Sequence, residues 1–126
     1  MIQLYSEQNI IDLNNIHSRF NRNLKGFFEE NHYYITLLII AAIVDGASTI
    51  YFMHLVGPEK EIHPVIRELS FILGPTSGPI AGKLLQLSIG MIATIYLRKY
   101  GSYILVITAV MYSWAATSNF LSYMVF

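Results

Sequence analysis

Six side chains that can ionise or hydrogen-bond lie inside otherwise apolar stretches of this chain. They are Asp45, Ser48, Thr49, Lys83, Gln86 and Asn119, here called the polar cluster. Ionisable groups are costly inside a bilayer, and where they occur they pair with one another or serve transport. The chemistry open to the polar cluster is therefore ion pairing, hydrogen bonding, or the passage of protons or cations.

Asp45 is the most informative residue of the polar cluster. Ser48 and Thr49 follow it at three and four residues, so the three side chains share one helical face. In the structural interpretation, Asp45 pairs with Lys83 or hydrogen-bonds the two amides of the cluster, at about 1 kcal/mol or less per contact. Helical rise places Lys83 roughly 10 Å nearer the membrane surface, so the lysine must reach down. The alternatives are a proton or cation relay, or contact with a partner subunit or cofactor.

Glu61 and His63 are weak candidates for two metal ligands at the membrane surface. His54 lies one loop away, but the spacing matches no known metal-ligand set, which favours an exposed loop histidine. The chain has no Cys, which excludes disulfides, thiolate catalysis and Cys-based metal sites. No catalytic triad or carboxylate pair is recognisable. We therefore expect neither a cofactor in this chain nor an enzyme acting by itself.

Four glycines are predicted to lie at helix–helix contacts: Gly74, Gly78, Gly82 and Gly90. The Gly78-x-x-x-Gly82 spacing is typical of membrane helices whose backbones approach closely. The same window does not match a phosphate-binding loop, which has four residues between its glycines and Ser or Thr after the lysine. Here only three residues intervene, and Leu84 follows Lys83.

The composition indicates that lipid, and not water, surrounds most of this chain. The chain has 126 residues, of which 54% are hydrophobic and 13% charged, and its mean hydropathy is +0.47. Soluble domains carry about 25% charged residues. The formal net charge is zero, so no overall field favours nucleic acid. Residues 1–31 contain no apolar signal-peptide core, and we expect them to remain in the mature protein.

These features predict an all-α integral membrane protein with three transmembrane helices, at about 33–56, 79–97 and 102–126. Each stretch is long enough to cross a hydrocarbon core of about 30 Å. Pro64 suits the first position of a helix, which predicts a short interfacial helix at 64–73 within the 57–78 loop. Residues 32–126 would form the transmembrane domain.

Residues 1–31 form the second predicted unit, an N-terminal amphipathic helix. Apolar residues recur at spacings of three and four along 8–30: Ile10, Leu13, Ile16, Phe20, Leu24 and Phe27. The helix is predicted to break at Glu29–Asn31. It can lie in the membrane interface or pack on a partner subunit, and the sequence leaves both open.

The distribution of basic residues predicts the orientation in a cell membrane. With three spans, five basic residues fall on one side: Arg19, Arg22, Lys25, Arg98 and Lys99. The 57–78 loop has only Lys60 and Arg67. Basic residues favour the cytoplasmic side, so the N-terminus is predicted inside and the 57–78 loop and C-terminus outside.

Four segments between residues 32 and 97 resemble a known family. They are 32–36 (HYYIT), 44–49 (VDGAST), 61–68 (EIHPVIRE) and 78–83 (GPIAGK). The pattern covers about half of the chain and resembles the small X subunit of archaeal ammonia monooxygenase. It also looks like an uncharacterised family of small prokaryotic membrane proteins.

The first resemblance implies a place beside the A, B and C subunits of that complex, which oxidises ammonia to hydroxylamine with dioxygen at a membrane site. Copper would then be held by the partner subunits, because none of the family's metal ligands can be carried onto this chain. The N-terminal amphipathic segment lies outside the resemblance.

The sequence thus predicts a non-catalytic accessory subunit of a membrane enzyme complex. One alternative is a homo-oligomeric proton or cation conduit, with Asp45 and Lys83 as the gate and the two amides as its lining. Oligomers would be needed because three helices enclose no pore. Another alternative is a small membrane-anchored protein that binds lipid or metal through Glu61, His63 and Arg67.

Overall fold

The computed structural model describes the backbone of residues 2–125 and the side chains of residues 13–125. Five α-helices make up most of this part of the chain: α1 (Ile2–Leu24), α2 (Phe27–Val56), α3 (Pro64–Leu73), α4 (Ser77–Tyr96) and α5 (Gly101–Val125). Two short 3-10 helices, η1 (Pro58–Lys60) and η2 (Arg98–Tyr100), lie in the connections. Three helical stretches, α2, α4 and η2 with α5, are long and apolar enough to cross a bilayer. The chain is an all-α membrane protein, as the sequence predicted.

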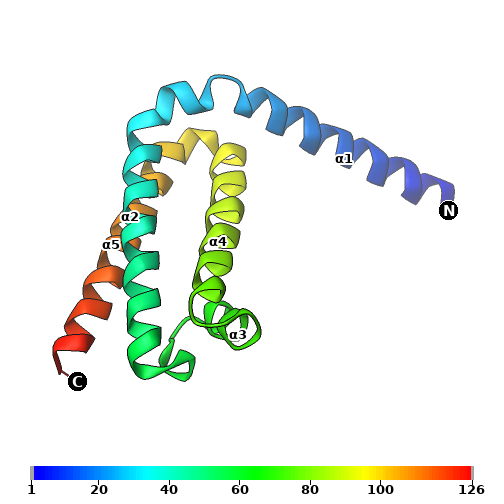
Figure 1. Cartoon of the computed structure of the whole chain (residues 1–126). Helices are drawn as coiled ribbons and strands as arrows, with labels where there is room; N and C mark the ends of the chain where they lie inside the picture. Colours follow the sequence, from blue (N-terminus) through cyan, green and yellow to red (C-terminus); the bar gives the residue numbers. More distant parts are fainter. Residues whose placement is uncertain (1, 126) are drawn as a thin grey trace.

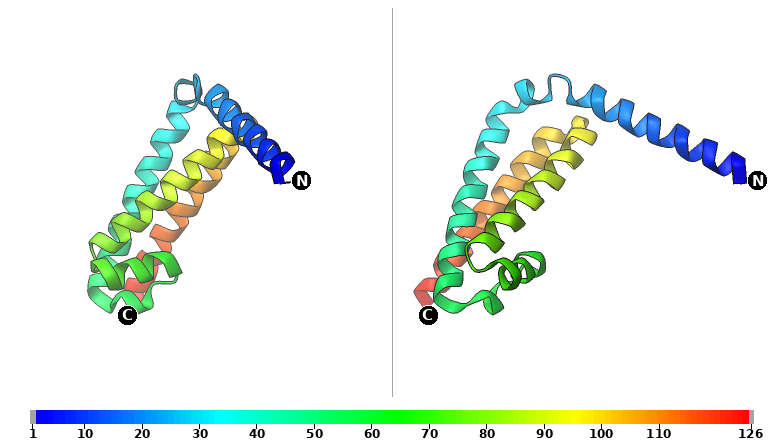
Figure 2. Two further views of the ribbon diagram at one scale, coloured as in Figure 1. Left: turned by 90° about the vertical axis from the view of Figure 1, so that its right-hand side faces the viewer. Right: turned by 45° about the vertical axis from the view of Figure 1, so that its right-hand side comes forward.

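Helices α2, α4 and α5 run side by side as a bundle (Figure 1). The α2–α5 contact is the most extensive in the structure, while α4 packs mainly on α3 and makes smaller contacts with α1 and α2. Helix α3 lies across the bundle at the end away from α1 (Figure 1). Helix α1 leaves the other end and extends away from the three spans, as the two rotated views show (Figure 2).

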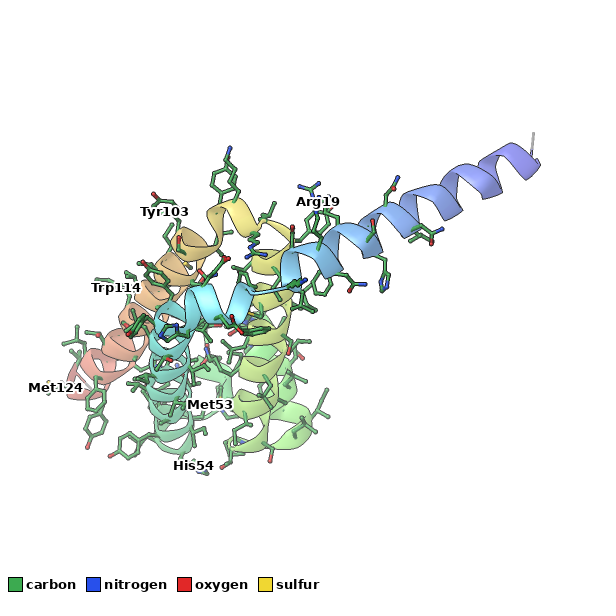
Figure 3. All side chains as sticks on the ribbon, turned by 90° about the horizontal axis from the view of Figure 1, so that it is seen from above. Arg19, Met53, His54, Tyr103, Trp114 and Met124 are labelled. Carbon is green, nitrogen blue, oxygen red and sulfur yellow. The ribbon has the colours of Figure 1, made fainter. Side chains whose placement is uncertain are left out.

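Small and apolar side chains fill the space between α2 and α5. The buried core includes Phe27 and Leu38 of α2, Leu105 and Ala109 of α5, and Ile95 of α4. Large apolar side chains elsewhere point outward, as expected where hydrocarbon takes the place of water. Figure 3 shows this for α5, where Tyr103 and Trp114 project from the bundle and are 70% and 72% exposed.

Several predicted boundaries are confirmed. Helix α3 covers the predicted residues 64–73, with Pro64 at its first position, and α2 ends at the predicted Val56. Glycines with positive φ follow both helices, Gly57 at 89° and Gly74 at 94°, a backbone region that side chains disfavour. The second span begins two residues before the predicted 79 and ends one before 97. The third begins at Gly101, and Phe126 lies outside the described residues.

The predicted break at Glu29–Asn31 is wrong, because α1 ends at Leu24 and α2 begins at Phe27. Gly26 makes the break instead, with a left-handed φ of 75° that glycine adopts without strain. The two glutamates occupy the first turn of α2, where the helix dipole favours carboxylates. The boundary between the N-terminal helix and the transmembrane domain therefore lies about five residues earlier than predicted.

Helix α1 has the predicted apolar face, but only part of it is covered. Phe20 and Leu24 pack against the core of the bundle. Leu13 and Ile16 are 65% and 50% exposed, and the side chain of Ile10 lies outside the described residues. Phe27, predicted for this face, is instead fully buried at the start of α2.

Candidate functional site

An ion pair between α2 and α4 forms the centre of the polar cluster. The Lys83 ammonium donates a hydrogen bond to Oδ2 of Asp45, and both residues are buried, at 8% and 3% exposure. Lys83 Nζ also lies 4.3 Å from the ring centroid of Tyr112 on α5, at cation–π distance. The predicted axial offset is thus bridged by the long lysine side chain. One contact set ties all three spans together.

Gln86 extends this ion pair toward the surface. Its Oε1 accepts a hydrogen bond from Lys83 Nζ at 3.2 Å, and its Nε2 lies 2.8 Å from Nε2 of His63. An ammonium can only donate, so the amide oxygen must face Lys83 and the amide nitrogen must donate to His63. The imidazole Nε2 is therefore unprotonated in this arrangement. A continuous hydrogen-bonded chain runs from exposed His63 to buried Asp45.

Asn119 belongs to a second branch of the polar cluster. Its Nδ2 is 3.1 Å from both Ser48 Oγ and Thr49 Oγ1, which joins α5 to α2. Ser48 Oγ in turn donates to the main-chain oxygen of Asp45 at 2.9 Å. The bond from Asn119 to Asp45 considered from the sequence is not made. Among the described side chains, every buried polar nitrogen and oxygen has a hydrogen-bond partner.

The chain of polar contacts does not continue toward the other end of the bundle. From Asp45 in that direction, the next buried side chains of α2 are Ala42, Ala41 and Leu38, and the more distant Asn31 donates only to the main-chain oxygen of Phe27. Leu105 and Ala109 face them from α5. Within the described part of the chain, the hydrogen-bonded path therefore opens only toward α3.

Glu61 and His63 are close together but are already engaged. The Glu61 carboxylate accepts a hydrogen bond of 2.8 Å from the His63 main-chain N–H. The imidazole contacts Gln86, and His54 bonds Thr76 at 2.9 Å. Among the described residues, no group of three or more His, Cys, Asp or Glu side chains is placed to hold a metal ion.

The four glycines predicted at helix contacts divide into two groups. Gly78 and Gly82 lie directly against α3, where an added Cβ would meet the Ser70 backbone and, at 2.8 Å, Cγ1 of Ile66. Gly74 instead ends α3 with its positive φ, and a Cβ there or at Gly90 would meet nothing within 4 Å. The glycine spacing thus serves α3 packing inside this chain, and for Gly74 and Gly90 the helix contact stays a prediction.

Arg98 organises a second polar site that the sequence analysis missed. Its guanidinium donates to the main-chain oxygens of Asn23 at 3.0 Å and Lys25 at 2.7 Å, and to Glu30 Oε1 at 2.5 Å. Asn23 Nδ2 donates to the main-chain oxygen of Tyr96 at 3.0 Å. We call this junction of residues 23–30 with 96–101 the elbow.

The elbow fixes α1 on the bundle. The last carbonyls of any helix lack partners within that helix, and Arg98 supplies donors for two at the end of α1. Arg19 stacks over Tyr96 at 4.7 Å from the ring centroid. Gly26 is a signal that a helix can end there with unpartnered carbonyl groups, but no sequence pattern marks Arg98 as their donor. Arg98 had been interpreted only as a marker of orientation.

Two adjoining apolar grooves follow the α2–α5 seam on its outer side. Their volumes are about 470 Å³ and 360 Å³, and both are lined by Val44 and Phe120. We call them together the seam groove. Six of the fifteen residues that line it have small side chains: Ala41, Ala47, Ser48, Ser113, Ala116 and Thr117. Sequence spacing did not reveal it, because the residues come from two helices far apart along the chain.

No protein-family model matches this chain, and no curated protein and no solved structure matches it either.

Proposed function

We propose that this chain is a non-catalytic accessory subunit of a membrane enzyme complex, and that the seam groove receives a transmembrane helix of a partner. The groove carries the proposal. In a bilayer, helices associate through close packing more than through hydrophobicity, so their interfaces are rich in small residues. The alanine, serine and threonine residues among those that line the groove allow such a close approach.

The polar cluster agrees with this role. Its buried side chains are satisfied within the chain, which suits a rigid bundle that presents a fixed surface. The complex we propose is a copper-dependent ammonia monooxygenase, with this chain beside the A, B and C subunits. That step rests on the resemblance of the four segments between residues 32 and 97. Copper then belongs to those partners, and α1 lies on the cytoplasmic side of the cell membrane.

Purification of the native protein in mild detergent, with mass spectrometry of what accompanies it, tests the proposal. We expect copper monooxygenase subunits in a fixed ratio. Ala47→Leu should reduce their recovery, because Ala47 lines the groove and the larger side chain fills it. Ala93→Leu on the exposed surface of α4 is the matched control and should leave recovery unchanged. A chain that purifies alone as a stable monomer would refute the proposal.

The hydrogen-bonded chain from His63 to Asp45 favours one alternative, a homo-oligomeric proton or cation conduit. It would take protons from the α3 end of the bundle and need a second copy to complete a path past Ala41 and Leu38. Proton flux into liposomes that contain the pure chain tests this function. Flux that stops in Asp45→Asn would favour the conduit, and flux that persists would eliminate Asp45 as its gate.

A further inference from the structure

The apolar face of α1 passes without interruption from a covered to an uncovered region. At 3.6 residues per turn, Leu13, Ile16 and Phe20 fall on one stripe that continues to Leu24. Phe20 and Leu24 contact the core of the bundle, whereas Leu13 and Ile16 extend beyond it and are at least half exposed. The uncovered part therefore faces the same way as the part that packs on the bundle.

The elbow holds this stripe in one orientation relative to the spans. Arg98 binds the end of α1, and both Arg19 and Asn23 contact Tyr96 at the end of α4. The stripe thus continues a buried contact at the level where the spans end, and α1 extends sideways from that level (Figures 1 and 2). The stripe of α1 therefore faces the level at which the surface of a bilayer around the spans would lie.

Charge distinguishes the two ends of the bundle. Around the elbow, basic residues outnumber acidic ones. The basic residues are Arg19, Arg22, Lys25, Arg98 and Lys99, and the acidic ones are Glu29 and Glu30. At the α3 end the balance reverses, with Lys60 and Arg67 against Glu59, Glu61 and Glu68. The side of α1 opposite the stripe is polar and exposed, including Asn14 and Ser18.

We infer that α1 lies in the headgroup region of the bilayer leaflet at the elbow end, with Leu13 and Ile16 directed toward the acyl chains. Its ligand is a lipid surface that contains anionic headgroups. A helix with one apolar face and one water-exposed face inserts about 5–10 Å into this boundary. The basic elbow attracts the anionic headgroups. This inference is independent of any partner subunit, because it concerns the chain alone in a membrane.

Fluorescence of the full chain in vesicles of phosphatidylcholine and phosphatidylglycerol tests the inference. The protein has one tryptophan, so Trp114→Phe leaves a background into which a single reporter is placed. Leu13→Trp reports the stripe, and Ser18→Trp reports the opposite face of the same helix. Brominated acyl chains quench tryptophan that reaches the hydrocarbon, and iodide quenches tryptophan that stays in water.

We expect brominated lipid to quench the Leu13→Trp reporter several-fold more strongly than the Ser18→Trp reporter, with the order reversed for iodide. Equal iodide quenching of both reporters would overturn the inference, because α1 would then stand in water. Protection of the Leu13→Trp reporter from both quenchers would also overturn it, because a second copy of the chain would then cover the stripe. Neither result bears on co-purification with partner subunits.

Discussion

Two ion pairs, at opposite ends of the bundle, use the same chemistry in different surroundings. The side chains of Lys83 and Asp45 are 11% and 4% exposed, whereas those of Arg98 and Glu30 are 28% and 61% exposed. In the first pair neither charge has water as an alternative partner. In the second the carboxylate is solvated, and Arg98 is also held by two main-chain oxygens. The buried pair should therefore act through charge, and the elbow pair mainly through capping of α1.

Removal of one member of the buried pair should produce the largest effect. Asp45→Ala leaves the Lys83 ammonium in the bundle without its counter-charge, and breaking a buried pair in this way costs about 3–5 kcal/mol. We expect a loss of that size in the free energy of unfolding, measured by denaturation in mixed detergent micelles.

The double variant Asp45→Ala with Lys83→Met is the control. It removes both charges and keeps an apolar side chain of similar length, so most of the lost stability should return. Equal stability of the single variant and the natural chain would show that Lys83 finds another partner, and would contradict the role given to the pair.

At the α3 end of the bundle, substitution at the contact between α3 and α4 should produce the next largest loss of stability. A methyl group at Gly78 would meet the Ser70 backbone, so Gly78→Ala forces the helices apart at a cost of about 1–3 kcal/mol. Gly90→Ala makes the same change on the same helix in open space, where alanine gains up to about 1 kcal/mol in helix propensity. We expect the free energy of unfolding to fall in Gly78→Ala and to rise in Gly90→Ala. Equal changes in the two variants would refute the packing of Gly78 against α3.

Most of the fold could be predicted from the sequence because lipid imposes simple requirements. Long apolar runs indicated the three spans, and Pro64 marked the start of α3 through local backbone preference. The break before α2 was misplaced because charge was weighed above conformation. Glu29 and Glu30 suit the first turn of a helix, whereas Gly26 has the φ that ends one.

The candidate site was predictable in its membership but not in its connections. Apolar surroundings identify Asp45 and Lys83 as a pair, since few other partners exist for them. Which amide reaches which residue depends on helix rotation, so the division between Gln86 and Asn119 was not foreseen. Arg98 was missed because its main partners are carbonyl groups, which every residue has and no sequence pattern marks.

At the elbow, Arg98→Ala should loosen α1 without unfolding the spans. It removes two hydrogen bonds from a charged donor to main-chain oxygens, worth about 1–2 kcal/mol together after allowance for partial exposure. Trypsin cleavage after Lys25 should accelerate roughly five- to thirtyfold, the factor that corresponds to this energy. Lys99→Ala, in the same turn, is the control and should leave the rate unchanged.

The smallest effect should come from Glu30→Gln, and its salt dependence separates the two ends of the molecule. Glutamine keeps an oxygen that can accept from Arg98 and removes only the charge, so cleavage after Lys25 should accelerate less than in Arg98→Ala. At 1 M salt the Debye length is about 3 Å, and the difference between Glu30→Gln and the natural chain should vanish. The penalty of Asp45→Ala should persist at the same salt concentration, because that pair is shielded from ions. A salt-independent effect at Glu30 would mean that the geometry of its hydrogen bond to Arg98, and not its charge, contributes to the elbow.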